Sequence, residues 1–125
     1  MKRVFVMIVT MSALAGCADK PEPTAEALEQ RAHELDVLAA ERQDAKAFDL
    51  YSLRCQKQIG SVDQYSRVLD AFFAGRSPKY VSATAEVDGE NGTVVSVDED
   101  PSAPASAREP RTWTFIDGEW KFDNC

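Results

Sequence analysis

The chain has few of the residues from which metal, redox and nucleophilic sites are built. Its 125 residues include one histidine and three cysteines, with no CxxC pair, no glycine-rich phosphate loop and no serine nucleophile elbow. A metal site needs several convergent ligands, so the lone His33 is expected on the surface of a helix. We therefore expect no metal, no cofactor and no catalytic set.

Long apolar runs and basic stripes are also missing. A membrane-spanning helix needs about 20 apolar residues, and the apolar segment over residues 4–13 is shorter. Basic residues occur singly along the rest of the chain, whereas binding to a phosphate backbone needs a basic stripe. We therefore expect a chain that does not cross the membrane and has no nucleic-acid partner.

The first residues have the layout of a secretory signal that ends in a lipobox. Two basic residues precede the apolar segment, which leads into Leu14-Ala15-Gly16-Cys17, and this order is typical of an exported precursor. The pattern predicts a signal peptide over 1–16 and a lipid-modified Cys17. The alternative is cleavage after Ala15 at an Ala-Leu-Ala site, which would give a secreted protein with a free thiol.

Lipidation would place the mature chain on the cell membrane, facing the extracytoplasmic side. Acyl chains contribute about 0.8 kcal/mol per buried methylene, so an anchor with more than one chain holds durably to the bilayer. Residues 17–23, with Pro21 and Pro23, predict an extended tether, and 24–125 a single domain. Removing the signal lowers the basic count from 14 to 12 against 21 acidic residues, a net charge of −9.

Acylation of Cys17 leaves Cys55 and Cys125 free to pair with each other. Small domains outside the cell commonly carry such a covalent link. In the chain-entropy model a loop of roughly 70 residues is worth about 4 kcal/mol. The alternatives are two buried thiols or a metal pair, although no histidine lies near either cysteine in the sequence.

Two helical segments are expected at the start of the domain. Over 24–40, apolar residues recur at intervals of three and four, namely Leu28, Ala32, Leu35 and Ala39. A second helix is predicted over 44–59, with Asp44 as its N-cap and Ala47, Phe48 and Tyr51 on its inner face. No glycine or proline separates the segments, so one bent helix and two separate helices are both open.

The next segment begins with a capping box and ends at glycine and proline. Ser61 and Gln64 have the N-cap and N3 spacing, and one helical face then carries Val62, Tyr65, Leu69 and Phe72. Residues 75–78 should end this helix. From Val81 to Val87 apolar residues alternate with polar ones, which predicts a strand with Val81, Ala83, Ala85 and Val87 facing inward.

Turn residues divide the rest of the chain into short strands. Asn91-Gly92 predicts a hairpin turn, followed by a strand over 93–98. Residues 99–110 contain three prolines and predict a flexible connection. Asp117-Gly118 predicts a second tight turn between two strands, marked by the alternating aromatic residues Trp113, Phe115, Trp120 and Phe122.

The order of helices and strands, together with two short patterns, resembles the NTF2-like superfamily and in particular small exported lipoproteins of the actinobacterial type. The patterns are Ser52-Leu53-Arg54-Cys55 and the terminal set Trp113, Asp117, Gly118, Trp120, Asp123 and Cys125. The resemblance covers 24–125. It implies an α+β cone in which N-terminal helices pack on a curved antiparallel sheet, often with a pocket at the wide end.

Members of that superfamily include isomerases, dehydratases and interaction modules, so the fold does not give the function. The isomerases use a tyrosine and acidic residues, but Asp49 and Asp70 match no catalytic motif here. Tyr51, Tyr65 and Trp113 are possible pocket lining, with core packing as the alternative. The acidic run 98–100 is expected to be a solvated turn rather than a cation site.

Three functions follow from these expectations. The first is a non-enzymatic lipoprotein whose domain binds an envelope protein or component. The second is a carrier or sensor that binds a small ligand, such as an apolar one, in the cone, which requires an open cavity. The third is an isomerase- or dehydratase-like enzyme, which requires a pocket-facing carboxylate paired with a tyrosine or histidine.

Overall fold

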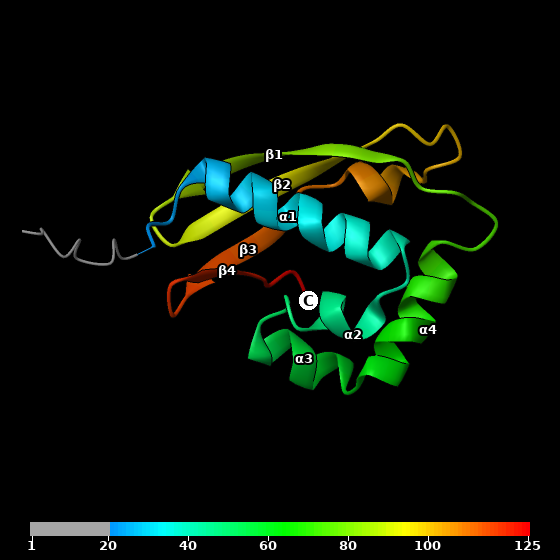
Figure 1. Cartoon of the computed structure of the whole chain (residues 1–125), viewed down its shortest axis with the longest axis horizontal. Helices are drawn as coiled ribbons and strands as arrows, with labels where there is room; N and C mark the ends of the chain where they lie inside the picture. The colour runs from blue at the N-terminus through cyan, green and yellow to red at the C-terminus, as the bar shows by residue number, and fades with distance from the viewer. Residues whose placement is uncertain (1–20) are drawn as a thin grey trace, which may run out of the picture.

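The computed structural model describes residues 21–125, so the predicted signal peptide and Cys17 lie outside it. Within this range, helices precede a four-stranded antiparallel sheet of order β1-β2-β3-β4 (Figure 1). The α+β class predicted from the sequence is confirmed. No helix of the described range has both the length and the apolar character that crossing a bilayer requires. The elements are α1 (Ala25–Ala40), α2 (Asp44–Phe48), α3 (Leu53–Ile59), α4 (Val62–Phe72), β1 (Tyr80–Asp88), β2 (Asn91–Asp98), η1 (Ala105–Arg108), β3 (Arg111–Ile116) and β4 (Glu119–Phe122).

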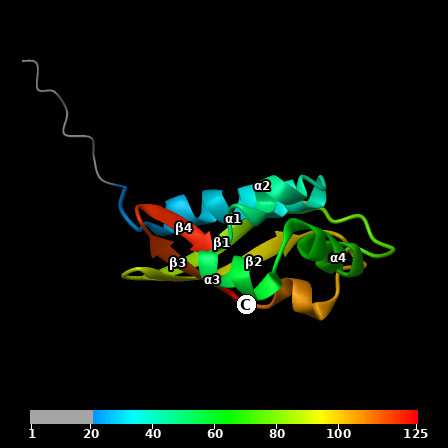
Figure 2. The same cartoon turned by 90° about the horizontal axis from the view of Figure 1, so that it is seen from below.

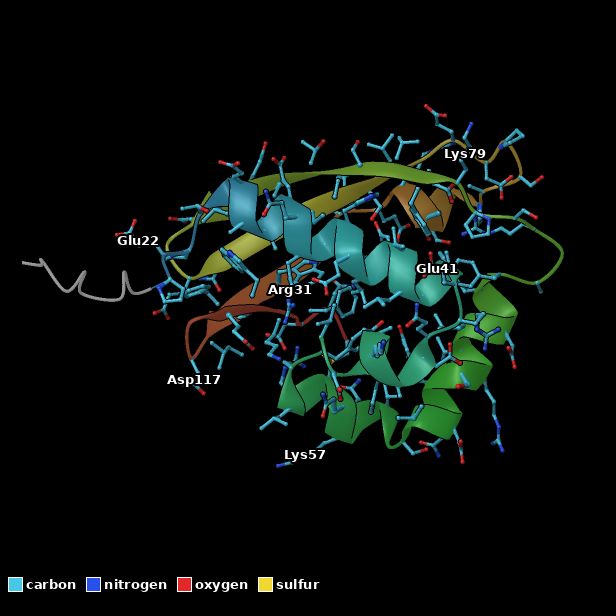
Figure 3. The ribbon with its side chains drawn as sticks, viewed as in Figure 1. Glu22, Arg31, Glu41, Lys57, Lys79 and Asp117 are labelled. Atoms are coloured by element: carbon cyan, nitrogen blue, oxygen red, sulfur yellow. A yellow bond between two sulfur atoms is a disulfide. The ribbon has the colours of Figure 1, made fainter. Side chains whose placement is uncertain are left out.

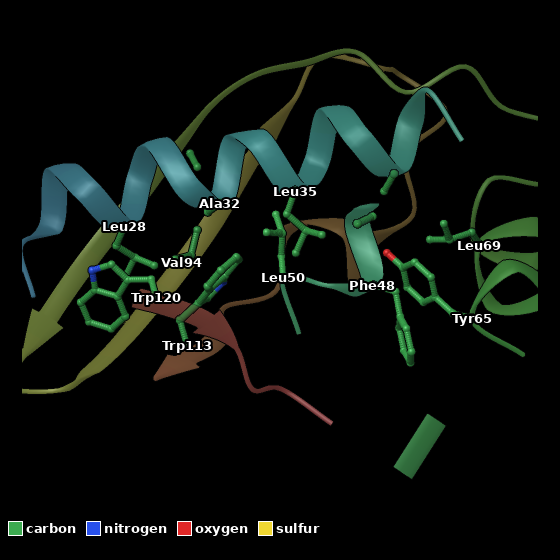
Figure 4. Close-up of a cluster of buried hydrophobic side chains, with 13 residues drawn as sticks. Leu28, Ala32, Leu35, Phe48, Leu50, Tyr65, Leu69, Val94, Trp113 and Trp120 are labelled. Carbon is green, nitrogen blue, oxygen red and sulfur yellow. The ribbon is translucent and has the colours of Figure 1, made fainter. Parts of the chain in front are cut away.

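Helix α1 lies across one face of the sheet and forms the core with it (Figure 2). Thr24 caps its start, since the Ala27 N–H donates to the Thr24 hydroxyl at 3.2 Å. The predicted apolar stripe is buried in full, and Leu28 faces the sheet residues Val94, Trp113 and Trp120 (Figure 4). Burying each large apolar side chain contributes roughly 1.5–3 kcal/mol.

Helices α1 and α2 are separate, which settles the point that the sequence left open. Arg42 has a φ of 58°, and the N–H groups of Arg42 and Gln43 turn back onto carbonyls in the last turn of α1. This is the Schellman arrangement, in which glycine is the usual residue at the position of Arg42. Asp44 is the first residue of α2 rather than its N-cap as predicted; the N-cap is Gln43, and the Asp44 carboxylate accepts from the Arg42 guanidinium at 3.0 Å.

The single helix predicted over 44–59 is wrong, because the chain between α2 and α3 runs beside the end of β4. The Ser52 N–H donates to the Phe122 carbonyl at 2.8 Å, and the Phe122 N–H donates to the Leu50 carbonyl at 2.9 Å. Tyr51 thus forms an isolated bridge with Phe122 and lies outside both helices. Pairing with a strand 71 residues away overrides the local helical periodicity, and Ser52 then caps α3.

The predicted turn at Asn91-Gly92 is also wrong, because the hairpin reverses two residues earlier. Asp88 pairs with Asn91, so Gly89 and Glu90 form the turn, with a φ of 60° at Gly89. Type II′ turns favour glycine at this first position. Gly92 belongs to β2, where a Cβ atom would collide with the Leu28 side chain. That glycine therefore allows α1 to approach the sheet closely.

The other strand predictions hold with one exception. Val81 was expected to face inward, but it is 42% exposed, because the register of β1 shifts between Tyr80 and Ser82. The second predicted turn is formed by Asp117 and Gly118, with φ angles of 50° and 80°. Further along β1, the predicted inward residues pack against the core as expected, namely Ala83, Ala85 and Val87.

The segment 99–110 is more ordered than predicted, and the acidic run before it is not a solvated turn. The segment contains η1, and Ala107 is buried. Asp98 and Asp100 are only 5% and 7% exposed, and both bind Arg76 Nη1, at 2.8 and 3.3 Å. Arg76 lies in the linker between α4 and β1, 22 residues before Asp98. The acidic residues 98–100 therefore gave no sign in the sequence that an arginine would pair with them.

The predicted Cys55–Cys125 disulfide is formed, and it ties α3 to the end of the chain. Arg54 reinforces this link by donating to the Asp123 carboxylate at 2.9 Å and to the Asp123 carbonyl at 2.7 Å. The Asp123 carboxylate also accepts from the Ser52 hydroxyl at 2.6 Å. Because these contacts hold the segment before α3 against β4, they fix the position of Tyr51.

Candidate functional site

A cavity of about 160 Å³ lies between α1, α4, η1 and the sheet. Val68 contributes to its wall and is 55% exposed, so the cavity reaches the surface beside α4. The polar part of the lining comprises Asp36, Tyr51, Tyr65, Tyr80, Ser96 and Arg111. The apolar part comprises Leu35, Ala39, Val68, Leu69, Phe72, Phe73, Ala107 and Phe122.

Asp36 is the only carboxylic acid in this lining, and α1 holds it there. Its Oδ2 atom is buried and has no hydrogen-bond partner among residues 21–125. Burial raises the pKa of Asp36 to about 7. A hydrogen bond from the Ser96 hydroxyl opposes this rise. The charge of Asp98 raises the pKa by a smaller amount, and the charge of Arg111 lowers it by a smaller amount. The carboxyl group is therefore poised between its two forms near neutral pH.

The aromatic wall consists of tightly packed rings from four parts of the chain. The Tyr51 ring centroid lies 5.0 Å from that of Tyr65 and 4.4 Å from that of Phe122. Burial raises the pKa of both tyrosines, and the two hydroxyls lie within hydrogen-bonding reach of each other. Burial also raises the pKa of Tyr80 to about 12. All three phenols are therefore neutral donors at physiological pH.

An ion cluster of Arg76, Asp98 and Asp100 lies next to the cavity. Burial acts to raise the pKa of Asp98, but hydrogen bonds from Arg76 and from the backbone N–H groups of Asp100 and Lys79 outweigh it and lower that pKa. The guanidinium of Arg76 also lies over the ring of Phe72, 4.8 Å from its centroid. Unlike Asp36, both aspartates of the cluster have a cationic partner.

The structure brings together two of the three predicted lining residues. Tyr51 and Tyr65 line the cavity, whereas Trp113 is 2% exposed and packs in the core, 5.6 Å from the Phe122 ring. Asp49 and Asp70 do not reach the cavity lining. Most charged side chains lie outside the core, as Figure 3 shows for labelled residues such as Glu41, Lys57 and Lys79.

Sequence reasoning missed Asp36, although its spacing carried a signal. It lies four residues after Ala32 and three before Ala39, so it shares the buried face of α1. A carboxylate on an apolar stripe is a candidate site residue, because burial without a partner is costly. His33 was expected on the surface but is only partly exposed, and its Nδ1 has no partner within the described residues.

A second hollow of about 430 Å³ lies at the other end of the sheet, between α3 and the turn joining β3 and β4. Leu53, 72% exposed, and Ile116, 39% exposed, are its apolar residues. Charged groups of both signs surround them, namely Arg54, Asp117, Glu119, Lys121 and Asp123. This surface is separate from the cavity around Asp36.

Across residues 21–125, histidine, cysteine, aspartate and glutamate side chains form no group of three or more that could hold a metal ion. No family model, no curated protein and no solved structure matches the chain.

Proposed function

We propose that this chain is an exported lipoprotein whose α+β domain, of the NTF2-like type, binds a small molecule in the cavity around Asp36. The observation that carries the proposal is a buried carboxylate oxygen without a partner among residues 21–125, inside a cavity lined mainly by aromatic and aliphatic side chains. Small-molecule sites combine an apolar wall with a few polar groups that fix orientation. Buried polar groups in folded proteins usually have a hydrogen-bond partner, and a bound ligand would supply one for this oxygen.

The size of the cavity sets the size of the bound group. Ligand pockets typically measure about 300–1,000 Å³, whereas a cavity of about 150 Å³ accommodates benzene. The volume of about 160 Å³ therefore fits one ring with a short substituent. A larger ligand would place one such group inside and extend past Val68 into solvent.

Binding fits the geometry better than isomerase-like catalysis. A proton-transfer site would pair the carboxylate with a tyrosine or the histidine. The hydrogen bond that acts on the pKa of Asp36 comes instead from Ser96, and neither a tyrosine nor His33 is among the groups that shift it. That the protein is not an enzyme stays a prediction.

Ligand binding is tested by filling the cavity. In the full chain with Cys17→Ser, which prevents acylation, NMR should detect binding of benzyl-sized probes. Ala107→Leu should weaken that binding at least fivefold, because Ala107 is buried and lines the cavity. Ala71→Leu, on the exposed face of α4, is the matched control and should bind normally. Ala39→Val serves as a second filling variant if Ala107→Leu fails to fold. Equal binding by filled and control variants would refute the proposal.

The lipid anchor has its own test. Cells that express the native chain should incorporate labelled palmitate into it and retain it in the membrane fraction. Cys17→Ser should abolish both, whereas Cys55→Ser should leave labelling intact. Labelling that survives Cys17→Ser would rule out the anchor.

The envelope-partner function stays a prediction that the second hollow makes testable. Crosslinking in native cells, followed by capture and mass spectrometry, should recover a reproducible partner if the domain is an interaction module. Leu53→Asp should then reduce recovery, because Leu53 is the most exposed large apolar residue in the described chain. If the substitution leaves recovery of the partner unchanged, the second hollow is not the surface that binds this partner.

A further inference from the structure

We propose that the cavity selects a small organic cation, an ammonium group with one apolar ring or short alkyl body, which the Asp36 carboxylate binds. This inference rests on the proposed binding function and names the chemical class of the ligand. The juxtaposition behind it is an unpartnered carboxylate oxygen beside a wall of aromatic rings.

The charges around the cavity favour a cation. Arg76 binds Asp98 and Asp100 through Nη1, and its Nη2 is buried without a hydrogen-bond partner among residues 21–125. Arg76 is not among the charges that shift the pKa of Asp36. Arg111 lines the cavity, but one of its terminal N–H groups donates to the Ser106 carbonyl at 2.7 Å. Its residual influence on Asp36 is smaller than that of burial. Above the pKa of Asp36, three carboxylates and two guanidinium groups lie in or beside the cavity, so negative charge is in excess.

The aromatic wall favours the same ligand class. The faces of tyrosine and phenylalanine rings carry negative charge density and attract cations within about 6 Å of the ring centroid. This wall already holds one cation, because the Arg76 guanidinium lies 4.8 and 5.3 Å from the ring centroids of Phe72 and Phe73. An ammonium group at Asp36 would lie among the rings of Tyr51, Tyr65 and Tyr80, which share the lining.

The unpartnered oxygen of Asp36 can recognise an ammonium group by a hydrogen bond. A primary ammonium offers three donors, of which one satisfies the free oxygen of Asp36. The ammonium–carboxylate contact is a charge-assisted hydrogen bond, and such bonds are roughly twice as strong as neutral ones. A neutral ligand would lack this contribution, and an anion would meet repulsion from Asp36.

Three probes of nearly identical shape test the inference: benzylammonium, benzyl alcohol and benzoate. Their affinities are measured by NMR titration at pH 8 with the full chain carrying Cys17→Ser. At this pH the carboxyl is mainly ionised, because the pKa of Asp36 is about 7. Benzylammonium should bind about tenfold tighter than either analogue, as expected for a charge-assisted contact in a partly desolvated site.

Two variants separate the carboxylate from the cavity. Asp36→Asn keeps the shape of the side chain and should remove the preference for benzylammonium over benzyl alcohol. Asp63→Asn alters an exposed residue of α4, serves as the matched control and should keep the full preference. Near-ultraviolet circular dichroism checks that both variants keep the native fold.

The outcomes distinguish the two proposals. Equal affinities for all three probes, unchanged by Asp36→Asn, would overturn the cation inference and leave ligand binding in place. Tightest binding of benzoate would overturn it in favour of recognition by Arg111. No binding of any probe would refute the proposed function itself, and the inference with it.

Discussion

The molecule contains two clusters of one arginine and two aspartates that differ mainly in burial. Arg42 binds Asp44 and Asp70 at 3.0 and 2.6 Å, with side chains 39%, 15% and 63% exposed. Arg76 binds Asp98 and Asp100 at 2.8 and 3.3 Å, with side chains 4%, 0% and 7% exposed. The contacts are similar in length, so distance alone does not distinguish them.

Burial decides what each cluster contributes. Exposed ion pairs contribute little, because water and salt screen them. In a buried cluster, loss of one member leaves the other charges without solvent or partner. Asp36 is a third case, a buried carboxylate without a cationic partner. The pKa values reflect this difference, because the pKa of Asp98, which pairs with Arg76, is lowered and the pKa of Asp36 is raised.

The largest expected effect comes from breaking the buried cluster. Arg76→Gln should lower the free energy of unfolding by about 3–5 kcal/mol, because it leaves Asp98 and Asp100 buried without their cation. Urea denaturation at pH 7, followed by circular dichroism, measures the change. Addition of salt should leave the loss nearly unchanged, since buried pairs are poorly screened. A loss below about 1 kcal/mol would show that water reaches these aspartates, and the buried cluster would then not differ from the exposed cluster around Arg42.

The next effect concerns the carboxylate without a cation. Folding raises the pKa of Asp36 from 3.8 to about 7, so the folded state binds more protons than the unfolded state between these values. The contribution of Asp36 to stability is full below about pH 4 and declines as pH rises to 7, by at most about 4 kcal/mol. Asp36→Asn should therefore be more stable than the native chain at pH 8.

The measurement compares urea denaturation of the native chain, Asp36→Asn and Asp63→Asn at pH 5 and pH 8. Only the Asp36 variant should gain stability relative to the native chain as the pH rises. The lowered pKa of Asp98 acts in a different range, because its stabilisation is lost as pH falls below about 4. A difference between Asp36→Asn and the native chain that does not change with pH would contradict the buried, unpaired state of Asp36.

Local patterns in the sequence predicted those parts of the fold whose contacts are local. The stripe of α1, the Ser61 cap of α4 and the turn at Asp117-Gly118 each depend on a few neighbouring residues, and the structure contains all three. The disulfide could be predicted because only two cysteines remained once Cys17 was set aside. These features require no knowledge of distant partners.

The errors arose where a distant partner decides the local structure. Tyr51 leaves the expected helix because it pairs with Phe122, and the run 98–100 is buried because Arg76 reaches it. Gly92 is a contact point for α1 rather than a turn. The cavity has the same origin: the spacing of Asp36 on α1 signals a buried carboxylate, but Ser96 and the aromatic wall reach it from distant parts of the chain.

The smallest expected effect comes from breaking the exposed cluster. Arg42→Ala should reduce stability by only a small fraction of the loss in Arg76→Gln, because solvent screens its pairs with Asp44 and Asp70. Arg42→Gly should be at least as stable as Arg42→Ala, since glycine adopts the φ of 58° at this helix end without steric cost. Urea denaturation in low salt and in 1 M salt measures both, and the difference between Arg42→Ala and the native chain should shrink in high salt. A loss that matches the loss in Arg76→Gln and persists in high salt would mean that position in the cluster, rather than burial, sets the strength of these pairs.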